Sequence, residues 1–155
     1  MGRCRQTGWM FAAVMAVACG WENTLFHRYC VVEEDWMRGG ELAFELPRLQ
    51  SGTGYQLLVD VRHDAGYPYT DLWLEVNHNL ADSTRSRIDT VRVQLIDEHG
   101  FPRGEGITGI YQREESIGEG VADGNGKAVV TLRHLMKDSL LRGITDLGVK
   151  VVRRP

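Results

Sequence analysis

Apolar and polar residues alternate one by one along most of this chain, beginning at residue 41. Leu42, Phe44 and Leu46 are separated by Ala43 and Glu45, and the same period of two recurs in five later segments. Together these segments are 42–46, 55–61, 72–76, 91–95, 128–132 and 147–151. Because successive side chains of a strand point to opposite faces, the alternation predicts six strands that each bury one face.

The breaks between these segments are rich in Gly, Asn and Asp, which favour turns, at residues 52–54, 63–66, 98–100 and 123–126. The sequence Asp-Gly-Asn-Gly at 123–126 predicts a type I′ hairpin. A calcium loop is rejected there, because the Glu that it needs at its twelfth position is His134. Only residues 135–141 suggest a helical turn or two. Short strands without a βαβ rhythm predict an all-β fold, a single antiparallel β-sandwich domain over residues 41–153.

The first 40 residues lack this alternation. Arg3 and Arg5 precede ten uncharged apolar residues at 9–18, and small residues lead into Cys19. Ten residues cover about 15 Å as a helix, half of a hydrocarbon core, which predicts a signal peptide over residues 1–18 rather than a membrane span. A cysteine directly after the cleavage site is the lipobox pattern of bacterial lipoproteins, so we expect lipidation of Cys19. Residues 19–40 then predict a lipid-anchored tether with a reach of about 25 Å.

Charge and cysteine content narrow the function further. Without the signal peptide the chain has 16 basic and 21 acidic residues, a net charge of −5. An acidic chain argues against nucleic acid as a partner and against a polybasic contact with anionic lipids. Beyond Cys19 the mature chain contains Cys30 alone, too few cysteines for an intramolecular disulfide or a structural zinc site.

No catalytic constellation stands out, so we expect a protein that is not an enzyme and that needs no metal or cofactor. The G-x-G-x-x-G match at 104–109 follows Pro102 and precedes β-type sequence, whereas a dinucleotide site needs a strand and a helix around it. The five histidines show neither HxH nor HExxH spacing, and no serine lies in a G-x-S-x-G elbow. Carboxylates such as Asp60 and Asp71 would face each other only across strands, as in many non-catalytic sheets.

The most distinctive segment is rich in aromatic residues. Tyr67, Tyr69 and Trp73 lie within seven residues, with Pro68 setting an extended path. Together with Trp36 they form a candidate interaction surface, since Tyr and Trp bring large contact area at low entropic cost. The alternative, which we favour, is that these rings close one end of the sandwich.

The chain resembles the gliding-motility lipoprotein GldH family of Bacteroidota. The resemblance rests on three blocks in order, together with Cys19 and Trp36. The blocks are YQLLVDVR with YPYTDLWLEV at 55–62 and 67–76, DTVRVQLIDEHG with GEG and GIY at 89–111, and LMKD with GITDLGVKV at 135–151. The departure is Phe101-Pro102-Arg103, where relatives tend to have an aromatic–aliphatic pair, and it concerns the shape of one loop.

The resemblance implies a membrane-anchored lipoprotein of the cell envelope, in the outer membrane and facing the periplasm, that carries acyl chains such as palmitate. It implies partners in the envelope apparatus for gliding, which is linked to type IX secretion, and it implies no catalysis. The alternative is a surface lipoprotein with a glycan-binding sandwich that uses its aromatic residues as stacking platforms. A third hypothesis, an envelope hydrolase, would need carboxylates or histidines clustered in a pocket.

Overall fold

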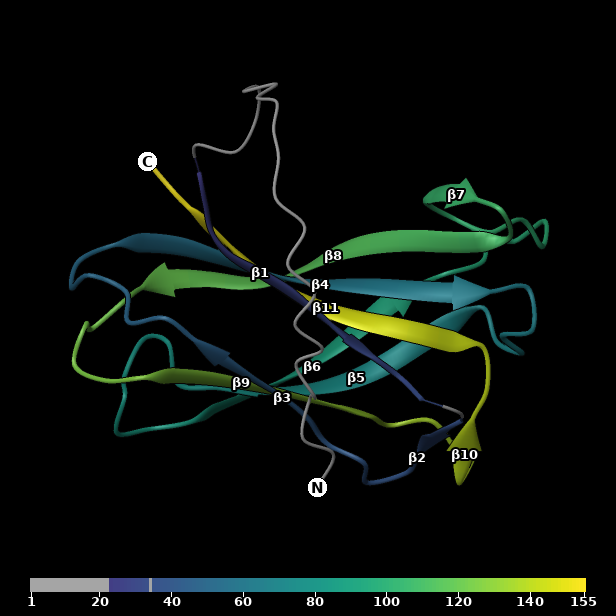
Figure 1. Cartoon of the computed structure of the whole chain (residues 1–155), viewed down its shortest axis with the longest axis horizontal. Helices are drawn as coiled ribbons and strands as arrows, with labels where there is room; N and C mark the ends of the chain where they lie inside the picture. Colours follow the sequence, from purple (N-terminus) through teal and green to yellow (C-terminus); the bar gives the residue numbers. More distant parts are fainter. Residues whose placement is uncertain (1–22, 34) are drawn as a thin grey trace, which may run out of the picture.

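The computed structural model describes residues 23–33 and 35–155, so the signal peptide and Cys19 lie outside the described residues. In this part of the chain there are eleven strands and no helix (Figure 1). The described residues therefore contain no helix that is long and apolar enough to cross a membrane. The strands are β1 (Thr24–Val31), β2 (Trp36–Met37), β3 (Leu42–Leu46), β4 (Gly54–Asp64), β5 (Asp71–His78), β6 (Arg87–Gln94), β7 (Glu105–Ile107), β8 (Ile110–Val121), β9 (Ala128–His134), β10 (Leu140–Leu141) and β11 (Ile144–Arg153).

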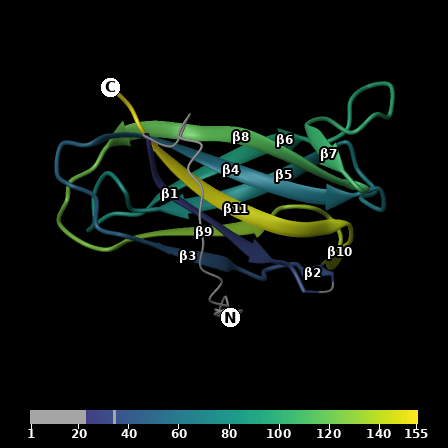
Figure 2. The same ribbon diagram turned by 45° about the horizontal axis from the view of Figure 1, so that its top comes forward.

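The strands form two facing sheets in which every pairing is antiparallel. One sheet has the order β1-β11-β4-β8-β7 and the other the order β3-β9-β5-β6, while β10 pairs with β2 in a separate two-stranded ribbon. Figures 1 and 2 show the two sheets as stacked layers. The predicted all-β antiparallel sandwich is confirmed.

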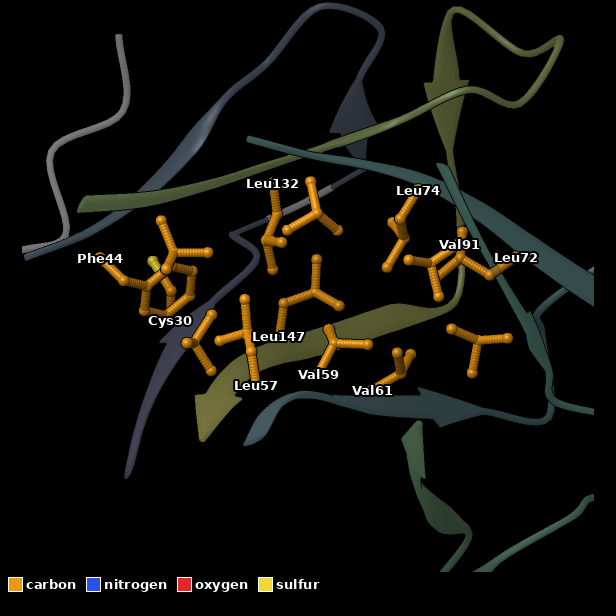
Figure 3. Close-up of a cluster of buried hydrophobic side chains, with 14 of the residues drawn as sticks. Cys30, Phe44, Leu57, Val59, Val61, Leu72, Leu74, Val91, Leu132 and Leu147 are labelled. Carbon is orange, nitrogen blue, oxygen red and sulfur yellow. The ribbon is translucent and has the colours of Figure 1, made fainter. Parts of the chain in front are cut away.

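The core lies between the two sheets and follows directly from the alternation. In β4, Leu57, Val59 and Val61 point inward, and in β5 Leu72 and Leu74 meet them from the other layer (Figure 3). These side chains are almost completely buried. Each contributes about 1.5–3 kcal/mol relative to an exposed position, so this interface is the main stabilising feature of the fold.

The prediction of a tether over residues 19–40 is wrong for most of the described residues in that range, because they form strands. Thr24–Val31 form β1, which pairs along its length with the C-terminal strand β11, and Trp36–Met37 form β2. β1 is an edge strand whose side chains are mostly half-buried or exposed, with Cys30 buried. Because an edge strand needs no strict apolar alternation, its sequence did not reveal it. The sandwich therefore begins at Thr24 instead of residue 41.

β8 was also missed, because its inward face is mostly polar or has no side chain, and its core-packed apolar residue, Ile117, lies where the register with β4 shifts. Tyr111, Arg113 and Glu115 share a face with the buried residues of β4, according to the register, and Gly118 and Gly120 continue it. Gly120 has a specific reason to be small, since a Cβ there would lie 2.8 Å from the hydroxyl oxygen of Tyr55. Such a pattern carries no period of two.

Two local predictions are wrong. Residues 135–141 contain no helical turn and instead lead into β10. Residues 123–126 do not close a hairpin, because β8 and β9 belong to different sheets. Asp123 shapes this crossover by accepting hydrogen bonds from the backbone N–H groups of Ser83 and Asn125 at 2.7 and 3.1 Å. Gly124 there has φ +72°, and its Cβ position lies 2.5 Å from the backbone nitrogen of Ser51, so only Gly fits.

The sandwich has two distinct ends. At the near end, β1 begins beside the end of β11, and the connections β3–β4, β5–β6 and β8–β9 lie there. At the far end lie the connections β1–β3, β4–β5, β6–β8 and β9–β11, which include β2, β7 and β10 (right side of Figure 1). The candidate aromatic residues all belong to the far end.

Candidate functional site

The structure divides the four candidate aromatic residues into two kinds. Trp36 and Tyr67 are buried in the core. Tyr69 is half-buried, and Trp73 is 42% exposed. The four therefore do not form one exposed surface, and only Tyr69 and Trp73 present a ring to solvent.

Trp36 closes the far end of the core. Its indole Nε1–H donates to the carbonyl oxygen of Gly40 at 3.0 Å, and its ring meets that of His134 edge-on at 5.0 Å. His134 Nε2 lies 3.1 Å from the backbone oxygen of Trp36. Burial lowers the pKa of His134, so the imidazole is neutral at pH 7 and packs as a core group.

Tyr67 occupies the corner between β4 and β5. Its hydroxyl donates to the backbone oxygen of Asp71 at 2.9 Å, and its ring lies 6.0 Å from that of His63. Burial raises the pKa of Tyr67 and lowers that of His63, so both groups are neutral. Gly143 approaches from the β10–β11 turn with φ +79°, and a Cβ there would lie 2.4 Å from the backbone nitrogen of Tyr67. Tyr67 is thus a packed corner residue, as the favoured alternative predicts.

Tyr69 and Trp73 both contact the segment that links β9 to β10. The hydroxyl of Tyr69 donates to Asp138 Oδ2 at 2.9 Å, and this hydrogen bond raises the pKa of the phenol. The backbone of Trp73 is bonded on both sides: its N–H donates to the sulfur of Met136 at 3.4 Å, and its carbonyl accepts from the N–H of Leu135 at 2.8 Å.

This segment and the neighbouring β2–β10 ribbon add three exposed apolar side chains that sequence reasoning missed. Met37 of β2 and Leu140 of β10 are opposite each other in the ribbon, and Leu135 follows β9 directly. All three are among the exposed large hydrophobic residues. Together with Trp73 we call them the far-end patch. From the sequence, the apolar residues of 135–141 were interpreted as a helical turn. In the structure they form an apolar loop beside Trp73 and the strand β10.

A second cluster lies on the outer face of the five-stranded sheet. His27 of β1 reaches across β11 to Asp60 of β4, with Nε2 and Oδ2 2.7 Å apart. Tyr29 lies beside the same carboxylate, and the guanidinium of Arg62 stacks over the Tyr29 ring at 3.9 Å. Burial, followed by the charge of Asp60, raises the pKa of Tyr29 to about 12. These side chains cover Asp60 completely, although the Asp60 side chain points away from the core.

The carboxylate pair considered from the sequence does not form. Asp60 lies in β4 of one sheet and faces Glu114 in register, whereas Asp71 lies in β5 of the other sheet and pairs with Arg92 at 3.0 Å. Within residues 23–33 and 35–155, no group of three or more His, Cys, Asp and Glu side chains is placed to hold a metal ion.

The family described as GldH lipoprotein matches residues 24–151, from the first residue of β1 to near the end of β11. The chain belongs to the GldH lipoprotein family. The gliding motility lipoprotein GldH of Flavobacterium johnsoniae is 28% identical over 152 residues, which cover 94% of each chain. The match to the GldH family thus spans both sheets, β1 included.

Among solved structures, the chain is similar to the tobacco streak virus coat protein dimer, at 10% identity. The similarity covers 89% of this chain and 90% of the other, with a TM-score of 0.30. By the family match and the Flavobacterium relative, the chain is a GldH-like lipoprotein of the cell envelope, and its resemblance to that family, drawn from the three sequence blocks, is confirmed.

Proposed function

We propose that this protein is a non-catalytic component or accessory of the envelope apparatus for gliding and type IX secretion. The observation that carries the proposal is the match to the GldH family over both sheets, together with a relative named for gliding motility. The lipobox at the N-terminus supports the same role, because it fixes the protein to a membrane where such an apparatus works.

Cys19 is the proposed site of lipid attachment. Two or three acyl chains bind a bilayer firmly, at about 0.8 kcal/mol per buried CH₂ group. Residues 20–23 alone separate Cys19 from β1 and span at most about 14 Å. The near end of the sandwich therefore faces the membrane, and the domain has little freedom to swing away from it. We place the protein in the outer membrane, facing the periplasm.

The polar cluster around Asp60 supports a structural role rather than catalysis. Asp60 is fully buried beneath His27 and Tyr29, so no substrate can reach its carboxylate without moving β1. Its function in this account is to fasten the edge strand β1 to the centre of the sheet. The strand that follows the lipid anchor is thus the one that carries this additional contact.

A surface glycan-binding protein is the alternative. The exposed ring of Trp73 favours it, since sugars stack on exposed aromatic faces. Burial of Trp36 and Tyr67 weighs against it, because two of the four proposed stacking platforms are then inaccessible. Protease treatment of intact cells separates the two functions: rapid loss of the protein supports surface display, and its survival supports the periplasmic position.

Deletion of the gene in a gliding host tests the proposal. We expect loss of colony spreading and of type IX secretion, restored by the wild-type gene. The Cys19→Ala variant should leave the membrane fraction and should fail to restore either activity. Normal spreading and secretion in the deletion strain would contradict the proposal.

A further inference from the structure

The lipid anchor is connected to the domain through a single strand. Cys19 lies four residues before Asn23, and Asn23 leads directly into β1. β1 is the outermost strand of its sheet, so among the described strands its backbone pairs with β11 alone. Any tension between the lipid and the body of the sandwich therefore passes through β1 before it reaches another element.

The direction of β1 determines how the strand meets such tension. It begins at the near end, beside the end of β11, and runs towards the far end (Figure 1). In the proposed orientation, with the near end facing the membrane, a pull away from the membrane acts on Asn23 along the axis of β1. The seven register pairs from Thr24–Val152 to Val31–Asp146 are then loaded together, in shear. A strand attached at its other end would instead open one pair at a time, at a lower force.

Side chains connect β1 to a second, more central strand. His27 reaches across β11 to Asp60 of β4 with a contact of 2.7 Å, and the guanidinium of Arg62, also in β4, lies 3.9 Å from the centre of the Tyr29 ring. We call these contacts of His27 and Tyr29 with β4 the clasp. Because β4 is paired on both sides, with β11 and with β8, the clasp passes tension into the middle of the sheet.

The clasp also opposes sliding of β1 along β11. A slip of one residue would turn Cys30 out of the core, since neighbouring side chains of a strand point to opposite faces. A slip of two residues would keep the faces but would move His27 away from Asp60. Asp60 is fully buried, so its carboxylate would lose its partner without gaining water, which is unfavourable. The core thus resists one slip and the clasp resists the other.

We infer that β1 is a tension-bearing strand: it holds the domain to its lipid against pulling, and the clasp keeps it in register under load. The inference rests on the proposed function, because a lipid on Cys19 and an apparatus that works against it supply the load. It adds a mechanical function to that account, in which the sandwich transmits force between the membrane and the apparatus.

Single-molecule pulling at constant force tests the inference on the whole mature chain. One handle is attached at residue 19, in place of the lipid, and the second at one of two positions. Ala65→Cys, exposed directly after β4, directs the force along β1. Pro155 lies two residues beyond Arg153, whose N–H donates to the oxygen of Asn23. A handle at Pro155 therefore pulls the start of β1 away from the end of β11.

We expect the domain to survive at least tenfold longer when it is pulled from Ala65→Cys than when it is pulled from Pro155 at the same force. Asp60→Asn should shorten the first lifetime about tenfold, because forced unfolding follows the unfolding rate and a charge-assisted hydrogen bond is lost. Glu114→Gln is the matched control, opposite Asp60 in register but exposed, and should leave the lifetime unchanged. Equal lifetimes in the two pulling directions, or equal effects of the two substitutions, would overturn the inference.

A disulfide between β1 and β11 tests the same inference in cells. His27 and Lys150 are opposite in register, at a cross-strand separation that a disulfide bridges. In the deletion strain, His27→Cys should lower colony spreading at least threefold at an unchanged amount of protein in the membrane fraction. His27→Cys combined with Lys150→Cys should restore spreading, because the covalent bond, verified by peptide mapping, holds β1 in register. Lys150→Cys alone should behave as wild type.

Wild-type spreading in the His27→Cys strain, or no recovery in the disulfide-bonded double variant, would also overturn the inference. Failure of the proposed function is a different result, namely a deletion strain that spreads and secretes normally. The pulling lifetimes are measured on purified protein and need no phenotype, so they separate the two failures.

Discussion

His27 and Asp60 form a 2.7 Å contact that joins an edge strand to a strand two places away in the sheet. In the intervening strand β11, Gly148 is paired with both Tyr29 and Asp60, and it has no side chain to separate them. A Cβ on Gly148 would lie 2.8 Å from the Tyr29 ring and 3.0 Å from the Cβ of Asp60. The edge strand β1 is thus attached by backbone pairing to β11 and by side chains to β4.

We predict that Asp60→Asn lowers the free energy of unfolding by about 1–3 kcal/mol, because it removes a charge-assisted hydrogen bond from a fully buried group. Urea unfolding followed by tryptophan fluorescence measures the change. Glu114→Gln is the matched control, since Glu114 is opposite Asp60 in register but exposed. Equal losses in the two variants would show that Asp60 has no special role.

Gly148→Ala should destabilise the fold by about 1–3 kcal/mol, because the added methyl group displaces the Tyr29 ring. Exposure of Tyr29 should also bring its pKa down from about 12, which is visible in the absorbance of tyrosinate during an alkaline titration. Gly118→Ala is the control, since nothing lies within 4 Å of its Cβ position. A Gly148→Ala protein with unchanged stability and tyrosine titration would rule out the packing described here.

Mild acid should destabilise the protein. Burial lowers the pKa of His63, His78 and His134 in the folded protein below the ordinary value of 6.5. At a pH between the folded pKa and 6.5, these histidines are therefore protonated in the unfolded chain but not in the folded one. Stability therefore falls as the pH drops below 6.5. Asp97 and Asp123, with pKa values held below 3.8 by backbone hydrogen bonds, add their effect only in stronger acid.

Urea midpoints at about pH 7.5 and about pH 5 measure this effect. The His134→Gln variant should show a smaller difference between the two midpoints than the wild type. A midpoint that is independent of pH in this range would contradict the assignment of neutral buried imidazoles.

Tyr67→Ala and Trp73→Ala should differ sharply in stability although the two residues are close in sequence. Loss of the buried corner residue Tyr67 should cost about 3–5 kcal/mol, whereas loss of the exposed Trp73 should cost less than about 1 kcal/mol. Thermal unfolding by circular dichroism provides the comparison. Similar costs for both would mean that Trp73 belongs to the core, and the far-end patch would lose its aromatic member.

The alternation of apolar residues was sufficient to predict β3, β4, β5, β6, β9 and β11, because each of these strands buries one face against the core. It could not reveal β1, an edge strand in which His27 and Tyr29 serve a polar contact with Asp60. It could not reveal β8 either, where most inward positions are polar residues or glycine and the apolar Ile117 lies at a shift of register. Backbone pairing with distant strands, rather than local pattern, determines both.

The candidate site was predictable only in part. Trp73 was found from its aromatic neighbours, but Tyr67 and Trp36 are buried by partners that are remote in sequence, Gly143 and His134. Met37 and Leu140 become neighbours only through the two-stranded ribbon. No spacing in the sequence links them.

The measurement that tests the central claim most directly is crosslinking of the lipidated protein in living cells, followed by mass spectrometry of the captured proteins. Our account predicts reproducible recovery of gliding or secretion components, and loss of that recovery when Cys19→Ala releases the protein from the membrane. Recovery of the protein alone, or bound to glycan, would contradict it.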